Sequence, residues 1–156
     1  MVATILFDAD PTEVPWEFFA DLSKQFWDEV RHSEFGALRL KELGVQPEIC
    51  NQTLFEQTQD MSILHRLCYL TLGLETFFMP RKAPRVKKFL EVGDPRSQLF
   101  ADQDWSDEIT HVRGGKRWVD HLLENDLRTS EDVLEEVRKH IESVSGQRQE
   151  KIAAPF

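Results

Sequence analysis

The chain has 156 residues, 40% of them hydrophobic and 30% charged, which fits one globular domain and excludes a disordered chain. Its net charge of -9 argues against a nucleic-acid partner. No apolar run approaches the roughly 20 residues that a membrane-spanning helix needs, and the N-terminus lacks the basic start of a signal peptide. We therefore expect a cytoplasmic protein without a membrane partner.

Helix signals dominate the first third of the chain. Only residues 2–7 lean toward a strand, and they have no evident partner strand. A long helix is expected to start at Pro11 or Pro15 and to end at Leu43. Proline fits the first turn of a helix, and Gly44 fits the position after its last turn.

Prolines also divide the middle of the chain. Residues 45–59 read as a loop with about one helical turn. A second helix is expected over residues 60–79, because Pro80 lacks the backbone N–H that a helix interior requires. A separate short helix is expected over residues 84–92.

Glycine and proline also mark the remaining elements. Gly93 ends the short helix, and the Asp-Pro pair that follows caps a helix over residues 95–124. A last helix is expected from residue 129 or 130 to about 144. The fold class is therefore all-α, with a single helical-bundle domain over residues 1–145 and a flexible tail over residues 146–156.

The pattern Asp-Glu-x-x-His occurs twice, at residues 28–32 and 107–111. Helical periodicity places Glu29 and His32 in the middle of one apolar face, and it places Glu108 and His111 in the middle of another. The two helical segments align around this motif and look like an internal repeat. On the helix between them, Glu75 is the only acid of the apolar face.

A buried carboxylate costs several kcal/mol unless it is paired or binds a metal. No Lys or Arg lies in the middle of these three apolar faces. A metal centre would satisfy every buried acid and histidine at once, and two iron ions match the charge and the ligand types. The candidate metal ligands are Glu29, His32, Glu75, Glu108 and His111.

These features resemble the ferritin-like di-iron carboxylate proteins, which take a Glu from each of two helices and a Glu-x-x-His from each of two others. The closest resemblance is to an uncharacterised family of bacterial and fungal ferritin-like domain proteins. It covers about residues 16–124 and implies a ferritin-like antiparallel helix bundle. The segments that carry it are WDEVRHSEFGALRLKELGV, LGLETFF, VGDPRSQLF and DEITHVRGGKRW.

The resemblance also implies a role for each ligand. Glu29 and Glu108 would bridge two metal ions. His32 would bind one ion and His111 the other, and Glu75 would be the terminal carboxylate on the His111 side.

Residues around the ligands also receive roles from the resemblance. Asp28 and Asp107 would each accept a hydrogen bond from the imidazole of the opposite helix and so orient it. Gly36 and Gly115 would let helices approach closely one turn beyond the ligands.

The sequence departs from the family at its N-terminus. The family pattern has a further helix, with a terminal Glu, before the first Glu-x-x-His. Without it, the ion on the His32 side lacks a clear terminal ligand. That ion could bind weakly, another chain could complete the site, or the site could have lost activity. The missing helix would also leave an apolar groove, which the last helix could cover in part, and we expect a homodimer to cover it.

The function implied by the resemblance is that of a di-iron oxidoreductase or oxygenase. Two iron ions, the one on the His32 side bound more weakly, would activate dioxygen or peroxide and oxidise a small-molecule substrate. Manganese is also compatible with these ligands. The alternatives are a non-enzymatic ferritin-like structural or partner-binding module with a partial metal site, and an iron-handling protein.

Overall fold

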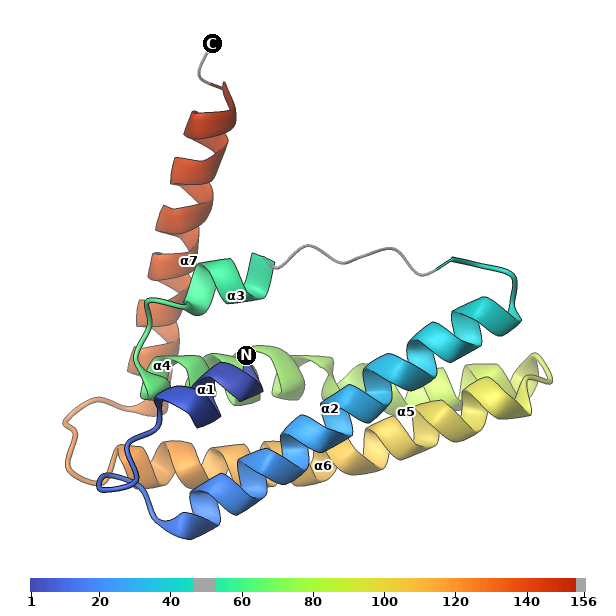
Figure 1. Cartoon of the computed structure of the whole chain (residues 1–156), viewed down its shortest axis with the longest axis horizontal. Coiled ribbons are helices and arrows are strands. Elements are labelled where there is room, and N and C mark those ends of the chain that lie inside the picture. The colour runs from blue at the N-terminus through green and yellow to red at the C-terminus, as the bar shows by residue number, and fades with distance from the viewer. Residues whose placement is uncertain (47–52, 154–156) are drawn as a thin grey trace.

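Three long helices form the centre of the computed structural model, which describes residues 1–46 and 53–153 (Figure 1). They are α2 (Trp16–Glu42), α6 (Pro95–Leu122), and the continuous helix built from α4 (Ile63–Cys68), η1 (Tyr69–Glu75) and α5 (Thr76–Glu91). In Figure 1, α6 runs antiparallel to the other two and packs against both. The described residues contain no strand, so the expected all-α helical bundle is confirmed.

Local sequence signals explain the ends of α2 and α6. α2 begins directly after Pro15 and ends one residue before Leu43, as predicted. Gly44 follows with a φ of 75°, a left-handed conformation that favours glycine. At the start of α6, the side chain of Asp94 accepts a hydrogen bond from the backbone N–H of Ser97.

Residues 2–7 do not form a strand. They belong to the short helix α1 (Val2–Asp8), which packs against α2 and α4. Val2 and Ile5 are both buried, and their spacing of three residues places them on one helical face. The strand tendency of this segment is overridden because no partner strand is present among the described residues, whereas a helix buries both side chains.

Pro80 does not end the second helix, so this prediction was wrong. The expected helices over residues 60–79 and 84–92 are one helix that continues through Pro80 and Pro84 to Glu91. Both prolines lie on the exposed side, and α6 packs along α5 and supports it. Each proline removes only one backbone hydrogen bond, and the packing offsets this cost.

The π-helical segment η1 interrupts the same helix just before α5. Its wider turn spans Tyr69–Glu75 and ends at the candidate ligand. At the end of this turn, the backbone carbonyl of Thr71 accepts hydrogen bonds from both the backbone N–H and the hydroxyl of Thr76, the latter at 2.7 Å. Such π-helical turns are frequent at functional sites.

The last helix, α7 (Ser130–Ala153), extends beyond its predicted end at residue 144. Its Val133 and Val137 are fully buried, and it packs against α4, η1 and α3 (Thr53–Thr58). α3 is the helical turn expected in the loop before α4. In Figure 1, α7 points away from the three long helices. The single domain over residues 1–145 and the flexible tail over residues 146–156 stay predictions.

The hydrophobic core lies toward the end of the bundle where α1, α4 and α7 meet α2 and α6. Phe18 and Trp118 pack edge to face there, with their ring centroids 5.5 Å apart. The apolar residues of the predicted α2 face are buried at this end only. Farther along α2, Phe26, Leu40 and Leu43 are exposed, so this face is not covered within the described part of the chain.

None of the helices within residues 1–46 and 53–153 combines the length and apolar character required to cross a membrane.

Candidate metal centre

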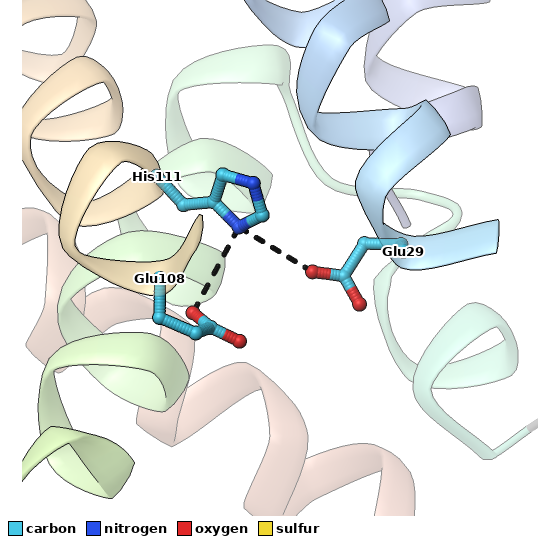
Figure 2. Close-up of side chains that lie close together, drawn as sticks. All are labelled: Glu29, Glu108 and His111. Atoms are coloured by element: carbon cyan, nitrogen blue, oxygen red, sulfur yellow. Dashed lines mark ion pairs between the residues drawn. The ribbon is translucent and has the colours of Figure 1, made fainter. Parts of the chain in front are cut away.

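One group of possible metal ligands lies where α2 faces α6. Glu29 reaches it from α2, and Glu108 and His111 reach it from α6 (Figure 2). His111 Nδ1 lies 3.5 Å from Glu29 Oε1 and 3.9 Å from Glu108 Oε2. One ligand atom from each residue lies within 4.8 Å of the others, which is close enough to share one ion. We call these three residues the first ligand group.

A second ligand group consists of His32, Asp104 and Glu108. His32 Nδ1 lies 3.6 Å from Asp104 Oδ1 and 3.7 Å from Glu29 Oε2. Glu108 is therefore shared by both groups, and Glu29 contacts both histidines. The sequence analysis missed Asp104, which lies one turn before Glu108 on α6, the spacing that places two residues on one face.

An aspartate from the opposite helix orients each imidazole. His111 Nε2 lies 3.1 Å from Asp28 Oδ2, and His32 Nε2 lies 3.0 Å from Asp107 Oδ2. Both contacts are those expected from the sequence. When the imidazole is neutral, as a metal-bound histidine must be, a proton on Nε2 leaves the Nδ1 lone pair directed at the ligand groups.

Arg31 joins the two aspartates. Its Nη2 donates to Asp28 Oδ1 at 2.6 Å and to Asp107 Oδ2 at 2.8 Å. Partial burial would raise the pKa of Asp28, but hydrogen bonds from Lys24, His111 and Arg31 hold it far below its usual range. The contact with Arg31 therefore favours the ionised form of Asp28, which accepts the hydrogen bond of His111.

Four buried side-chain atoms of the centre have no hydrogen-bond partner among the residues that the structure describes. They are His32 Nδ1, Glu75 Oε2, Glu108 Oε2 and His111 Nδ1. A buried polar atom without a partner is costly, and native proteins contain few of them. Imidazole nitrogen and carboxylate oxygen are suitable ligands for iron and manganese. The residues present therefore fit a divalent transition metal.

Glu75 belongs to neither ligand group, although the family resemblance implies that it is the terminal carboxylate on the His111 side. Its Oε1 accepts a hydrogen bond of 2.5 Å from Gln25 Nε2, a contact that the sequence did not indicate. Burial, followed by the negative charges of Glu108 and Glu29, raises the pKa of Glu75 to about 9. Its carboxyl group is therefore protonated at neutral pH when no metal is present.

Glu29 is less buried than its position in the middle of the apolar helix face predicts. Its side chain is 41% exposed. Its remaining burial would raise its pKa, but the interactions with His32 and His111 lower it. Burial likewise opposes the charged form of His32, yet Glu29 and Asp107 outweigh it and raise the pKa of His32 to about 9. Glu29 is exposed because no further helix covers this face among the described residues.

Lys82 contradicts the expectation that no cation lies among the buried acids. Its Nζ lies 2.7 Å from Asp104 Oδ2 and 3.1 Å from Glu108 Oε1, and the residue is 9% exposed. It was missed because Pro80 was expected to end the helix. In the continuous helix, Lys82 lies two turns beyond Glu75 on the same face, so this spacing was the available signal.

Gly36 and Gly115, which were both expected to allow close helix contacts, have different surroundings in the structure. A Cβ atom at Gly115 would overlap the side chain of Thr71, so this close approach of α6 and η1 requires glycine. A Cβ atom at Gly36 would meet no atom of the described residues within 4 Å, so the prediction for Gly36 was wrong. The reason is that the second half of α2 lacks a covering helix in the described part of the chain.

A cavity of about 290 Å³ lies beside His111. Its apolar wall includes Leu22, Leu67 and Trp118, and Gln25 lines it as well. The cavity therefore adjoins the first ligand group and could admit a small molecule to it.

The family model of DUF455, described as a protein of unknown function, matches residues 1–156. Comparisons with curated proteins and with solved structures found no match. The resemblance to ferritin-like di-iron proteins stays a prediction from the sequence.

Proposed function

The chain belongs to DUF455, a family of unknown function, and we propose that it is an iron-dependent oxidoreductase with its metal centre between α2 and α6. When bound, iron would supply the electron-transfer chemistry needed to reduce dioxygen or peroxide. Manganese is the alternative metal, because it accepts the same nitrogen and oxygen ligands.

The observation that carries this proposal is the convergence of buried atoms without partners on one point. Among the described residues, Glu108 Oε2 and His111 Nδ1 are buried without hydrogen-bond partners, and His111 Nδ1 faces the carboxylates of both Glu29 and Glu108. A bound cation would satisfy them, and it would explain why aspartates fix both imidazoles through Nε2.

The helix arrangement gives further support. α2 and α4 run in the same direction, so a long crossover connection joins them (Figure 1). Ferritin-like bundles contain one such crossover and build their metal sites from carboxylates and Glu-x-x-His motifs on facing helices. Here the facing motifs lie on α2 and α6.

Several residues of the chain would prepare the centre for its reaction. Asp28 keeps the proton of His111 on Nε2, and Gln25 holds Glu75 next to the ligands. Metal binding would draw the proton from Glu75 because a nearby cation favours the carboxylate. The cavity lined by Leu22 and Trp118 would receive a small, partly apolar substrate beside His111.

Metal analysis and dioxygen consumption test this function together. Protein purified without chelator should retain iron or manganese, and the double variant Glu29→Ala with Glu108→Ala should lose it. Reconstitution with Fe(II) should make the wild-type protein consume dioxygen faster than the double variant does. The matched control is the exposed Glu34→Ala on α2. Wild-type protein that neither retains these metals nor gains thermal stability from them would refute the proposal.

The contact of Lys82 with Asp104 and Glu108 favours a second candidate function. A lysine in the centre is compatible with a structural module whose partial metal site only stabilises the bundle. That module would bind iron and melt at a higher temperature with it, but it would not accelerate dioxygen consumption.

A further inference from the structure

Lys82 occupies the second ligand group. Its ammonium contacts Asp104 Oδ2 at 2.7 Å and Glu108 Oε1 at 3.1 Å. Its side chain is 10% exposed, and those of Asp104 and Glu108 are 11% and 9% exposed. The three charged groups therefore form an ion cluster that is largely shielded from water, where such contacts are stronger than at a surface.

The two oxygens of Glu108 face different partners. Oε1 contacts Lys82, whereas Oε2 has no hydrogen-bond partner and faces His111 Nδ1 at 3.9 Å. The lysine thus pairs with one oxygen of Glu108, and the other oxygen faces His111. This second oxygen remains available for an ion.

Within the described part of the chain, Lys82 forms ion pairs with Asp104 and Glu108, so the other two members of the first ligand group, Glu29 and His111, have no ammonium contact. Among the described residues, the ion pairs of Glu29 involve only His32 and His111. His111 Nδ1 is buried and unpaired, so this group has a free nitrogen donor beside two carboxylates. A divalent ion can bind Glu29, His111 and Glu108 Oε2 while Lys82 keeps its contact with Glu108 Oε1. An ion at the second group competes with Lys82 for both Asp104 and Glu108.

We propose that the Lys82 ammonium takes the place of a second metal ion, so that the protein binds a single ion at Glu29, Glu108 and His111. This inference rests on the metal binding proposed above. Removal of the ammonium then opens a second metal site formed by His32, Asp104 and Glu108.

Titration with Mn(II), followed by calorimetry and electron paramagnetic resonance, tests this inference. Wild-type protein should bind one Mn(II) per chain and give the six-line signal of an isolated ion. Lys82→Met should bind two, and magnetic coupling between neighbouring ions should broaden that signal. Lys82→Arg keeps a cation and should bind one. Lys87→Met on the same helix, whose side chain is 78% exposed, is the matched control and should also bind one.

A second variant keeps the test valid if Lys82→Met does not fold. Lys82→Gln keeps a hydrogen-bond donor for both carboxylates but removes the charge, and it should also bind two ions. Circular dichroism establishes which variants fold. Two ions in the wild-type protein would overturn the proposed role of Lys82. One ion in the folded Lys82→Gln variant would overturn it as well. Both results would leave the proposed metal function intact. No ion in the wild-type protein would instead refute the proposed function itself.

Discussion

The two histidines of the centre depend on aspartates that are distant in sequence. Asp28 on α2 orients His111 on α6, and Asp107 on α6 orients His32 on α2. Because the two helices are antiparallel and carry the same motif, each aspartate meets the imidazole of the opposite helix. Arg31 connects the two halves of this arrangement.

The aspartates provide a matched pair of variants. If one ion binds at the first ligand group, Asp28→Asn should weaken Mn(II) binding by about 10- to 100-fold, because His111 loses its ionised acceptor. Asp107→Asn should have a much smaller effect, since it orients His32 only. Calorimetric titration measures both affinities. Equal losses in the two variants would contradict the binding of one ion at the first group.

Glu75 makes the stability of the metal-free protein depend on pH. Its pKa is about 9 in the folded chain against an ordinary value of 4.5. Between these values the unfolded chain releases a proton that the folded chain keeps, so the free energy of unfolding falls as pH rises. His32, with its pKa raised from 6.5 to about 9, acts in the same direction over the upper part of this range.

Glu75→Gln is therefore expected to stabilise the metal-free protein at about pH 8 and to reduce the fall of stability with pH. The same variant should weaken metal binding, because it removes a carboxylate beside the first ligand group. Urea denaturation in the presence of a chelator, at several pH values, measures the first effect. The exposed Glu34→Gln is the control. A Glu75→Gln protein less stable than wild type at pH 8 would contradict the burial of an uncharged carboxyl group.

At the scale of elements, the continuity of the helix from Ile63 to Glu91 decides the composition of the centre. It brings Glu75 and Lys82 to one face opposite α6. η1 lies within this helix, directly against α6, and Thr71 is nearly inaccessible there. The contact between η1 and α6 therefore tolerates little additional volume.

Two adjacent glycines of α6 test this contact. Gly115→Ala should destabilise the protein by about 1–3 kcal/mol, because the added methyl group overlaps Thr71. Gly114→Ala, whose Cβ would meet nothing within 4 Å, should stabilise it by about 0.5–1 kcal/mol through helix propensity.

Chemical denaturation measures both changes in the free energy of unfolding. Thr71→Ala should recover part of the stability lost in Gly115→Ala, because it removes atoms that the methyl group overlaps. Equal effects of the two glycine substitutions would show that η1 and α6 are not in close contact.

At the scale of the whole molecule, apolar side chains remain exposed along the second half of α2. Phe35, Leu38, Leu40 and Leu43 are between 38% and 57% exposed. Leu38 also lines a hollow with Leu99 and Phe100. Exposed apolar surface of this kind favours association. In a two-fold symmetric dimer, each copy of the chain covers this apolar surface on the other copy.

We therefore predict a homodimer formed through this face of α2. Light scattering at micromolar concentration should give twice the 18.2 kDa of one chain. Leu38→Glu should shift the protein toward the monomer, because it places a charge in the interface. Leu127→Glu, at a fully exposed residue in the turn between α6 and α7, should leave the dimer unchanged. A wild-type mass of 18.2 kDa would refute the dimer.

The helices that could be predicted are those whose signals are local. Gly44 and Gly93 mark the ends of two helices, and Asp94 caps the next one. The Asp-Glu-x-x-His repeat likewise identified Glu29, His32, Glu108 and His111, which lie close together in the structure. A spacing of three residues places the Glu and the His of each motif on one face of a helix.

Features that depend on packing could not be predicted in this way. The sequence alone determined the helical class and the two motifs, and the family resemblance implied the pairing of aspartates with histidines. Only the tertiary structure decided that the helix passes Pro80, that Lys82 and Asp104 enter the centre, and that Glu29 is partly exposed. The physical reason is that a proline's cost, a lysine's partner and a carboxylate's exposure depend on the helices packed around them, whereas helix periodicity depends on the chain alone.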